Sequence, residues 1–172
     1  RQLEELHIGS IGVTDAGMDH VPKLTNLKKL MMFGCDNVTD KGLAKLTALR
    51  SLQDLHIAHS RLTVAGLASL NSMPTLTRVN VTDLERGGAV LNLSGLTNLE
   101  DLALGFRPRS PDAFDDADLA CLTNLKKLRW LQIGPRDFTD RGMLYLAGLT
   151  EIDRLGLGGA GLTDEGLKHL AN

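Results

Sequence analysis

The sequence has few of the residues that mark several common protein classes. It contains only two cysteines, Cys35 and Cys121, so no disulfide framework is predicted. The 19 basic and 21 acidic residues give a net charge of −2, whereas nucleic-acid-binding proteins usually carry a basic excess. No stretch approaches the roughly 20 consecutive apolar residues that a membrane-spanning helix needs. Neither a nucleic acid nor a membrane is therefore predicted as a partner.

Aromatic residues are also scarce, at 3% of the chain, although 42% of its 172 residues are hydrophobic. Leucine supplies much of this hydrophobic content, and there are 18 glycines. The length is sufficient for one domain with a substantial core. A composition dominated by leucine and glycine is typical of a repetitive scaffold, so internal repeats are the first pattern to test.

The pattern L-x-x-L-x-L recurs through the whole chain. Its copies are LEELHI, LKKLMM, LQDLHI, LTRVNV, LEDLAL, LRWLQI and IDRLGL, starting at residues 3, 27, 52, 76, 99, 128 and 152. A spacing of 20 to 29 residues is the signature of leucine-rich repeats. The alternation of apolar residues at the end of each motif predicts a short strand with one buried side. The sequence therefore predicts one domain, residues 1–172, with seven repeats.

A second motif, T-D-x-G, follows the strand motif in several repeats. It appears in VTDAGM, VTDKGL, FTDRGM and LTDEGL, and LTVAGL is a variant. Leu43, Leu46 and Leu49 then follow at helical spacing. The threonine is predicted to be a helix N-cap and the aspartate to lie in the positive first turn. The motif is therefore interpreted as structural. In the fourth repeat VTDLERGGAV replaces it, and an irregular segment is expected there.

The predicted fold class is α/β: a leucine-rich repeat solenoid forming a right-handed arc, with a parallel sheet on the concave face and helices on the convex face. Residues 38–49, 138–149 and 162–170 resemble the cysteine-containing, F-box-associated type of leucine-rich repeat and its bacterial relatives. The resemblance implies a binding scaffold. No F-box segment is present in the sequence, so an adaptor role in ubiquitin ligation is not supported.

Candidate sites for chemistry are weak. The string GLGGAG at 156–161 matches G-x-G-x-x-G but lacks the longer βαβ unit and acidic residue of a dinucleotide site. His7 and His56 flank Met31 at about 9.6 Å, two strand spacings, so one zinc would need either a longer reach from these side chains or a third ligand nearby. Asp115, Asp116 and Asp118 are interpreted as a variant helix cap rather than a calcium site. No catalytic residue, cofactor or metal site is predicted, and the protein is not expected to be an enzyme.

Three residues per strand are expected to point out of the concave face. The first column reads Glu5, Lys29, Asp54, Arg78, Asp101, Trp130, Arg154. The second reads His7, Met31, His56, Asn80, Ala103, Gln132, Gly156. The third reads Gly9, Phe33, Ala58, Thr82, Gly105, Gly134, Gly158. The alternating signs of the first column predict a charge ladder. Trp130 interrupts the ladder and is either an interface anchor or a cover for the stems of its neighbours.

The fifth repeat is longer than the others, and GFRPRSPDA is its extra segment. Pro108 and Pro111 are expected to stiffen it. We expect this segment to project from the C-terminal edge of the sheet, beside Trp130. The predicted partner-binding residues are therefore Met31, Phe33, His56, Asn80, Phe106, Arg107, Arg109, Trp130 and Gln132.

The functional hypothesis is a non-catalytic module that binds a protein or peptide partner through the concave face and the fifth-repeat loop. A rigid spacer or assembly element, with end-to-end self-association, is an alternative. A surface-acting regulator of a partner enzyme, such as a GTPase activator, is another. Neither end of the sequence carries a polar capping segment, so we expect the chain to be part of a longer protein or to have its ends covered by partner chains. The compartment is not predicted beyond a weak preference for the cytoplasm.

Overall fold

The structure, a computed structural model, describes residues 2–9, 12–107, 114–134, 138–157 and 161–171. Each L-x-x-L-x-L motif forms one strand, which begins two residues after the first residue of the motif. The strands are β1 (Glu5–Gly9), β2 (Lys29–Phe33), β3 (Asp54–Ala58), β4 (Arg78–Leu84), β5 (Asp101–Phe106), β6 (Trp130–Ile133) and β7 (Arg154–Leu157).

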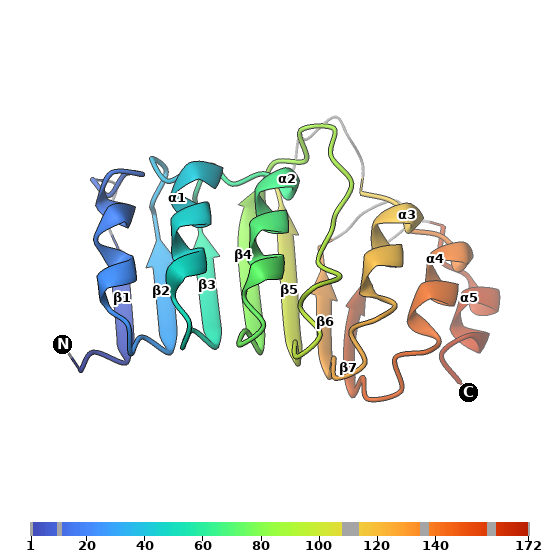
Figure 1. Ribbon diagram of the computed structural model, residues 1–172. Helices are drawn as coiled ribbons and strands as arrows, with labels where there is room; N and C mark the ends of the chain where they lie inside the picture. The colour runs from blue at the N-terminus through green and yellow to red at the C-terminus, as the bar shows by residue number, and fades with distance from the viewer. Residues whose placement is uncertain (1, 10–11, 108–113, 135–137, 158–160, 172) are drawn as a thin grey trace.

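All seven strands join in one parallel sheet in the order β1 to β7, so each strand pairs with its neighbour in sequence (Figure 1). The register places equivalent residues of successive motifs opposite each other, as in Leu6 with Leu30 and Leu30 with Leu55. This alignment confirms the predicted parallel sheet. Residues at equivalent positions of successive motifs, the columns defined above, are therefore neighbours across the sheet.

The helices lie together on one side of the sheet (Figure 1). They are α1 (Asp40–Lys45), α2 (Val64–Leu67), α3 (Asp116–Leu119), α4 (Asp140–Leu146) and α5 (Asp164–Lys168). Turns of 3-10 helix continue α1, α2 and α3, over Leu46–Ala48, Ala68–Ser72 and Ala120–Leu122. The first repeat has only two 3-10 turns, Gly17–Asp19 and Val21–Lys23. Pro22 lacks the N–H that an α-helix would need there.

The fourth repeat has no helix between β4 and β5, and residues 85–100 are all described. The expected irregularity is therefore confirmed. Asp118 of α3 is fully buried and holds this segment: its Oδ1 accepts a hydrogen bond from the Leu91 N–H at 3.0 Å. Arg86 Nη1 lies 3.0 Å from Asp118 Oδ2 at an angle that forms no hydrogen bond, so this contact is a buried ion pair.

The core is a continuous stack of leucine positions between the sheet and the convex side. Leu30, Leu55 and Leu102, at equivalent positions of β2, β3 and β5, are 0% exposed, as are Leu43 and Leu67 of the helices. A single repeat could not bury these side chains, but adjacent repeats cover one another. The structure thus forms one hydrophobic core along its length.

The threonine of T-D-x-G caps its helix, as predicted. Thr39, Thr63, Thr139 and Thr163 each accept a hydrogen bond on Oγ1 from a backbone N–H in the first turn. In the fifth repeat Asp115 takes this place and forms a capping box with Asp118. The interpretation of 114–119 as a variant of the repeat is confirmed, and Phe114 is buried at the apolar position before the cap.

The aspartate of the same motif has a second role that the sequence interpretation missed. Asp15, Asp40, Asp116 and Asp140 each accept two hydrogen bonds from the threonine of the following repeat, on one oxygen from its N–H and on the other from its hydroxyl. The partners are Thr39, Thr63, Thr139 and Thr163, at 2.6–2.9 Å. We refer to this pairing as the Asp–Thr clamp. It links successive repeats on the helical side of the sheet.

The glycine of T-D-x-G makes room for the clamp. A Cβ atom added at Gly42, Gly66, Gly142 or Gly166 would lie no more than 2.5 Å from the clamping carboxylate of the preceding repeat. The four-residue motif therefore works as a unit. Its threonine and glycine contact the aspartate of the preceding repeat, and its aspartate accepts hydrogen bonds from the threonine of the following repeat.

Candidate binding face

The concave face is the face of the sheet opposite the helices, and its columns follow the predicted alignment. Glu5, Lys29, Asp54, Arg78, Asp101, Trp130 and Arg154 are consecutive register partners. The second column, from His7 to Gly156, is aligned in the same way. The rows of side chains on this face are thus fixed by the backbone pairing.

Charged residues of the first column pair with one another, which confirms the charge ladder. Lys29 Nζ lies 2.6 Å from Glu5 Oε1. Arg78 bridges two strands, with Nη1 3.5 Å from Asp54 and Nε 3.3 Å from Asp101. The hydrogen bond from Lys29 lowers the pKa of Glu5. Exposed pairs of this kind contribute little to stability, and they leave few unpaired charges in the column.

An apolar and aromatic cluster occupies the face over β2 and β3. It consists of Met31, Phe33 and His56, and the Phe33 and His56 rings meet edge-on with centroids 4.9 Å apart. Phe33 is 37% exposed, which is unusual for a phenylalanine outside an interface. Burial lowers the pKa of His56; Asp54 acts in the opposite direction and Lys29 in the same one. The imidazole is therefore held toward its neutral form, which suits an apolar surface.

Trp130 lies near the other end of the same face. The Arg154 guanidinium lies 5.6 Å from the centroid of its ring, in a cation–π contact. The indole is half-buried, so one part rests against the neighbouring side chain and another faces solvent. Both sequence interpretations of Trp130 are compatible with this position. Gln132, on the same strand, is exposed.

Between the cluster and Trp130 the second column holds Asn80 and Ala103. Ala103 of β5 is 8% exposed, and Asn80 of β4 lies between it and His56. The Asn80 Oδ1 atom is covered and has no hydrogen-bond partner among the described residues. Small side chains here leave a shallow surface between the cluster at β2–β3 and Trp130 at β6.

The third column is regular only in its first half. The pairing of β4 with β5 shifts register between Val81 and Leu84, and Asp83 adopts a positive φ of 62°. Asp83 accepts a hydrogen bond from the His59 N–H at 3.2 Å. At the end of β4, side chains therefore do not alternate between the two faces of the sheet as the sequence pattern predicted.

The described start of the fifth-repeat segment, residues 105–107, differs from its predicted position. Trp130 pairs with Asp101 at the start of β5, whereas Arg107 follows the end of that strand. Six residues at about 3.3 Å each separate the two by about 20 Å along the sheet. Residues 105–107 therefore do not lie beside Trp130, because tryptophan occupies the first position of its strand, and the prediction is wrong for this described part of the segment. Arg109 and the two prolines lie outside the described residues.

Phe106 and Arg107 make contacts within the protein. The Phe106 ring stacks on buried Phe114 with centroids 4.6 Å apart. Arg107 donates hydrogen bonds to the carbonyls of Asp83 at 3.1 Å and Ser60 at 2.9 Å, and it pairs with Glu85 at 3.1 Å. Arg107 thus ties together the C-terminal ends of the third, fourth and fifth strands.

The described residues contain no group of three or more His, Cys, Asp or Glu side chains placed to hold a metal ion. Cys35 is buried, and burial raises the pKa of Cys121 to about 11, so its thiolate is strongly disfavoured at neutral pH. Within the same ranges, no helix is long and apolar enough to cross a membrane. The concave face presents aromatic ring edges, an amide side chain and paired charges.

Comparisons with known proteins agree with this architecture. A family model for the leucine-rich repeat matches residues 23–46. No curated protein matches the chain. Among solved structures, the chain is similar to an internalin C2 from Listeria monocytogenes, with 24% identity and a TM-score of 0.66 over 98% of this chain and 66% of that one.

Two plant receptors share the fold at lower identity. The peptide hormone receptor RGFR1, in complex with RGF2, has 16% identity and a TM-score of 0.50 over 81% of this chain and 22% of that chain. The Arabidopsis thaliana receptor kinase GASSHO1/SCHENGEN3, in complex with CASPARIAN STRIP INTEGRITY FACTOR 2, has 18% identity and a TM-score of 0.53 over 90% and 21%. This chain therefore spans just under two thirds of the internalin C2 structure and about a fifth of each of the two receptor structures.

The parallel sheet, the helices on one face and these similarities define the class: an α/β leucine-rich repeat solenoid. The chain thus has the leucine-rich repeat fold. The cysteine-containing, F-box-associated type is not confirmed.

Proposed function

We propose that this chain is a non-catalytic interaction module whose concave face binds an extended peptide or a protruding loop of a protein. The proposal rests on the presence of two separate groups of candidate anchor residues on the same open face. Met31, Phe33 and His56 form the first, and Trp130 with Gln132 forms the second. Asn80 of β4 and Ala103 of β5 lie between them in the second column.

Several features support this assignment. Aromatic side chains at a solvent-facing position are typical anchors of interfaces. Charged residues of the first column form ion pairs with each other. The apolar cluster is therefore the surface of this face that is available to a partner. Two structures with the same fold were solved in complex with RGF2 and CASPARIAN STRIP INTEGRITY FACTOR 2. Phe106, Arg107 and Arg109 remain candidate contributors at the strand ends, outside the two anchors.

A random peptide library displayed on phage tests the proposal. The wild-type chain is the bait, and selected peptides are then titrated against Phe33→Ala and Trp130→Ala by fluorescence polarisation. Each substitution should weaken binding at least about tenfold, because an aromatic anchor contributes about 2 kcal/mol or more. Circular dichroism establishes that the variants are folded.

Tyr145→Ala is the matched control, since Tyr145 is also 37% exposed but lies on α4, on the other side of the sheet. It should bind the selected peptides as the wild type does. Peptides that bind the two concave-face variants as tightly as the wild type, or a library that yields no binder, would contradict the proposal.

A further inference from the structure

Asn80 of β4 is the polar residue that lies between the two groups of anchor residues on the concave face. It is half-buried, and its covered Oδ1 atom has no hydrogen-bond partner among the described residues. An amide oxygen that has lost its water without gaining a donor costs folding free energy. A ligand that donates a hydrogen bond to the Asn80 carboxamide would recover this cost.

The neighbours of Asn80 leave room for a chain to cross the sheet. Toward Trp130 the next residue of the second column is Ala103, which is 8% exposed, and Gly105 follows two residues later on the same strand. These small residues of β5 allow the main chain of a partner to approach the sheet beside the Asn80 carboxamide.

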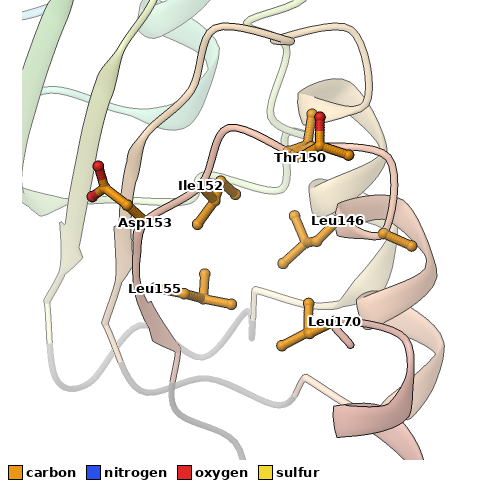
Figure 2. Close-up of a pocket in the computed structure, with 8 residues that line it drawn as sticks. Leu146, Thr150, Ile152, Asp153, Leu155 and Leu170 are labelled. Atoms are coloured by element: carbon orange, nitrogen blue, oxygen red, sulfur yellow. The ribbon is translucent and has the colours of Figure 1, made fainter. Parts of the chain in front are cut away.

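The hollow between β7 and the helical layer is a separate feature. It measures about 240 Å³, and its lining includes Leu146, Ile152, Leu155 and Leu170 (Figure 2). None of its lining residues belongs to the three columns of the concave face. A chain that crosses the sheet at Asn80 therefore lies on the open face and not in this hollow.

The anchor residues lie on both sides of Asn80 at similar distances. Met31 is two strands away in the same column, which is about 10 Å. Trp130 is two strands away in the other direction and two positions nearer the start of its strand, which is about 12 Å. Met31 and Trp130 are therefore about 20 Å apart, the length of about six extended residues.

The geometry of an extended chain matches this separation. Every second side chain of such a chain points to the same face, so side chains at positions i and i+6 both point toward the sheet. One of them can contact the cluster of Met31, Phe33 and His56 while the other contacts Trp130. The main chain midway between them then passes over Asn80.

The charges of the first column define the character of the residues between the two apolar side chains. The column contains three carboxylates and three cations, from Glu5, Asp54, Asp101, Lys29, Arg78 and Arg154. Arg78 pairs with the carboxylates on both sides, at 3.5 and 3.3 Å. A charged partner side chain would be attracted by one member of this ladder and repelled by the next. The balanced ladder is therefore complementary to an uncharged segment.

We infer that the partner is an extended peptide segment with bulky apolar side chains at positions i and i+6 and uncharged residues between them, and that the Asn80 carboxamide binds its main chain midway. This inference rests on the proposed function of the concave face and names the ligand that the face binds. A carboxamide has both a donor and an acceptor, so it matches the N–H and C=O groups of any residue. The terminal torsion of asparagine is broad, so a rotation of the side chain brings Oδ1 toward the peptide at little cost.

The peptides selected by phage display test the spacing. Their aligned sequences should contain two bulky apolar residues separated by five uncharged ones. One glycine inserted between the two apolar residues should weaken binding at least about tenfold, because the second side chain then points away from the sheet and its anchor contact is lost. One glycine inserted outside the pair is the control and should leave the affinity unchanged.

Asn80→Leu tests the main-chain contact, because leucine is similar in size to asparagine and has no amide. It should weaken peptide binding about three- to tenfold and raise the midpoint of urea unfolding, since it removes a covered oxygen that has no donor. A purely structural role for the amide would not give these opposite effects. Gln53→Leu removes an exposed amide outside the three columns and should change neither quantity.

A series of peptides, each with one backbone N–H replaced by an ester oxygen, locates the contact. Replacement midway between the two apolar residues should weaken binding to the wild type by the same three- to tenfold, equivalent to one hydrogen bond. The same peptide should bind Asn80→Leu as well as the unmodified peptide does. Replacement outside the apolar pair should have no effect on either protein.

The inference is overturned by selected peptides that lack the i, i+6 pair, by a glycine insertion between the pair that leaves the affinity unchanged, or by midway esters that affect the wild type and Asn80→Leu equally. In each of these cases, peptides that still lose affinity for Phe33→Ala and Trp130→Ala would uphold the proposed function. A library that yields no binder would overturn both.

Discussion

At the scale of single residues, His56 links the chemistry of the concave face to pH. Burial favours its neutral form, so its pKa in the folded chain is below the ordinary value of 6.5. Lys29 lowers the pKa further and Asp54 raises it. In the unfolded chain the imidazole regains its ordinary pKa and binds a proton more readily. The free energy of unfolding should therefore fall as the pH drops from about 6.5 toward the folded pKa, below which the loss is complete.

The effect of neighbouring charges on the pKa of His56 can be tested with two substitutions that should shift it in opposite directions. Lys29→Met should raise the pKa of His56, and Asp54→Asn should lower it, as measured by NMR titration of the imidazole Cε1–H signal. Lys41→Met, which removes an exposed charge on α1, is the control and should leave the titration unchanged. Shifts in the same direction for Lys29→Met and Asp54→Asn would contradict this electrostatic account.

At the scale of elements, the Asp–Thr clamp explains why short helices stay aligned with their neighbours. Burial raises the pKa of Asp15, but hydrogen bonds from the Thr39 backbone and hydroxyl lower it more, and the net pKa is below its ordinary value. The bonds from Thr163 lower the pKa of Asp140 in the same way. The ionised carboxylate is the better acceptor, so the stabilisation is present above the ordinary pKa and is lost in acid.

Removal of one clamp should have a measurable effect on stability. Asp116→Ala takes away two charge-assisted hydrogen bonds to Thr139, at 2.9 and 2.6 Å, and should lower the free energy of unfolding by about 2 to 3 kcal/mol. Asp164→Ala loses only the first-turn charge of α5 and should cost less than about 1 kcal/mol. Urea denaturation compares the two. Equal losses would show that the helix dipole, rather than the clamp, accounts for the effect.

The clamp also shows where inference from sequence reached its limit. The strand positions, the columns of the concave face and the caps follow from local spacing, which the sequence displays directly. The contact between Asp40 and Thr63 joins residues 23 positions apart, and nothing within one motif indicates it. The only indication in the sequence was that Thr, Asp and Gly recur together in the T-D-x-G motif. Trp130 was misplaced relative to the fifth-repeat segment because its position along the strand was not compared with the strand end.

At the scale of the whole molecule, stability should vary along the solenoid because each repeat contacts only its neighbours. β3 has a covered core on both sides, whereas Leu155 and Leu157 of β7 are only half-buried. In the monomer, backbone amides of 154–157 should therefore exchange with deuterium at least about tenfold faster than those of 54–58, equivalent to about 1.4 kcal/mol in opening free energy. Hydrogen-exchange mass spectrometry measures this gradient, and uniform exchange from β1 to β7 would instead indicate one cooperative unit.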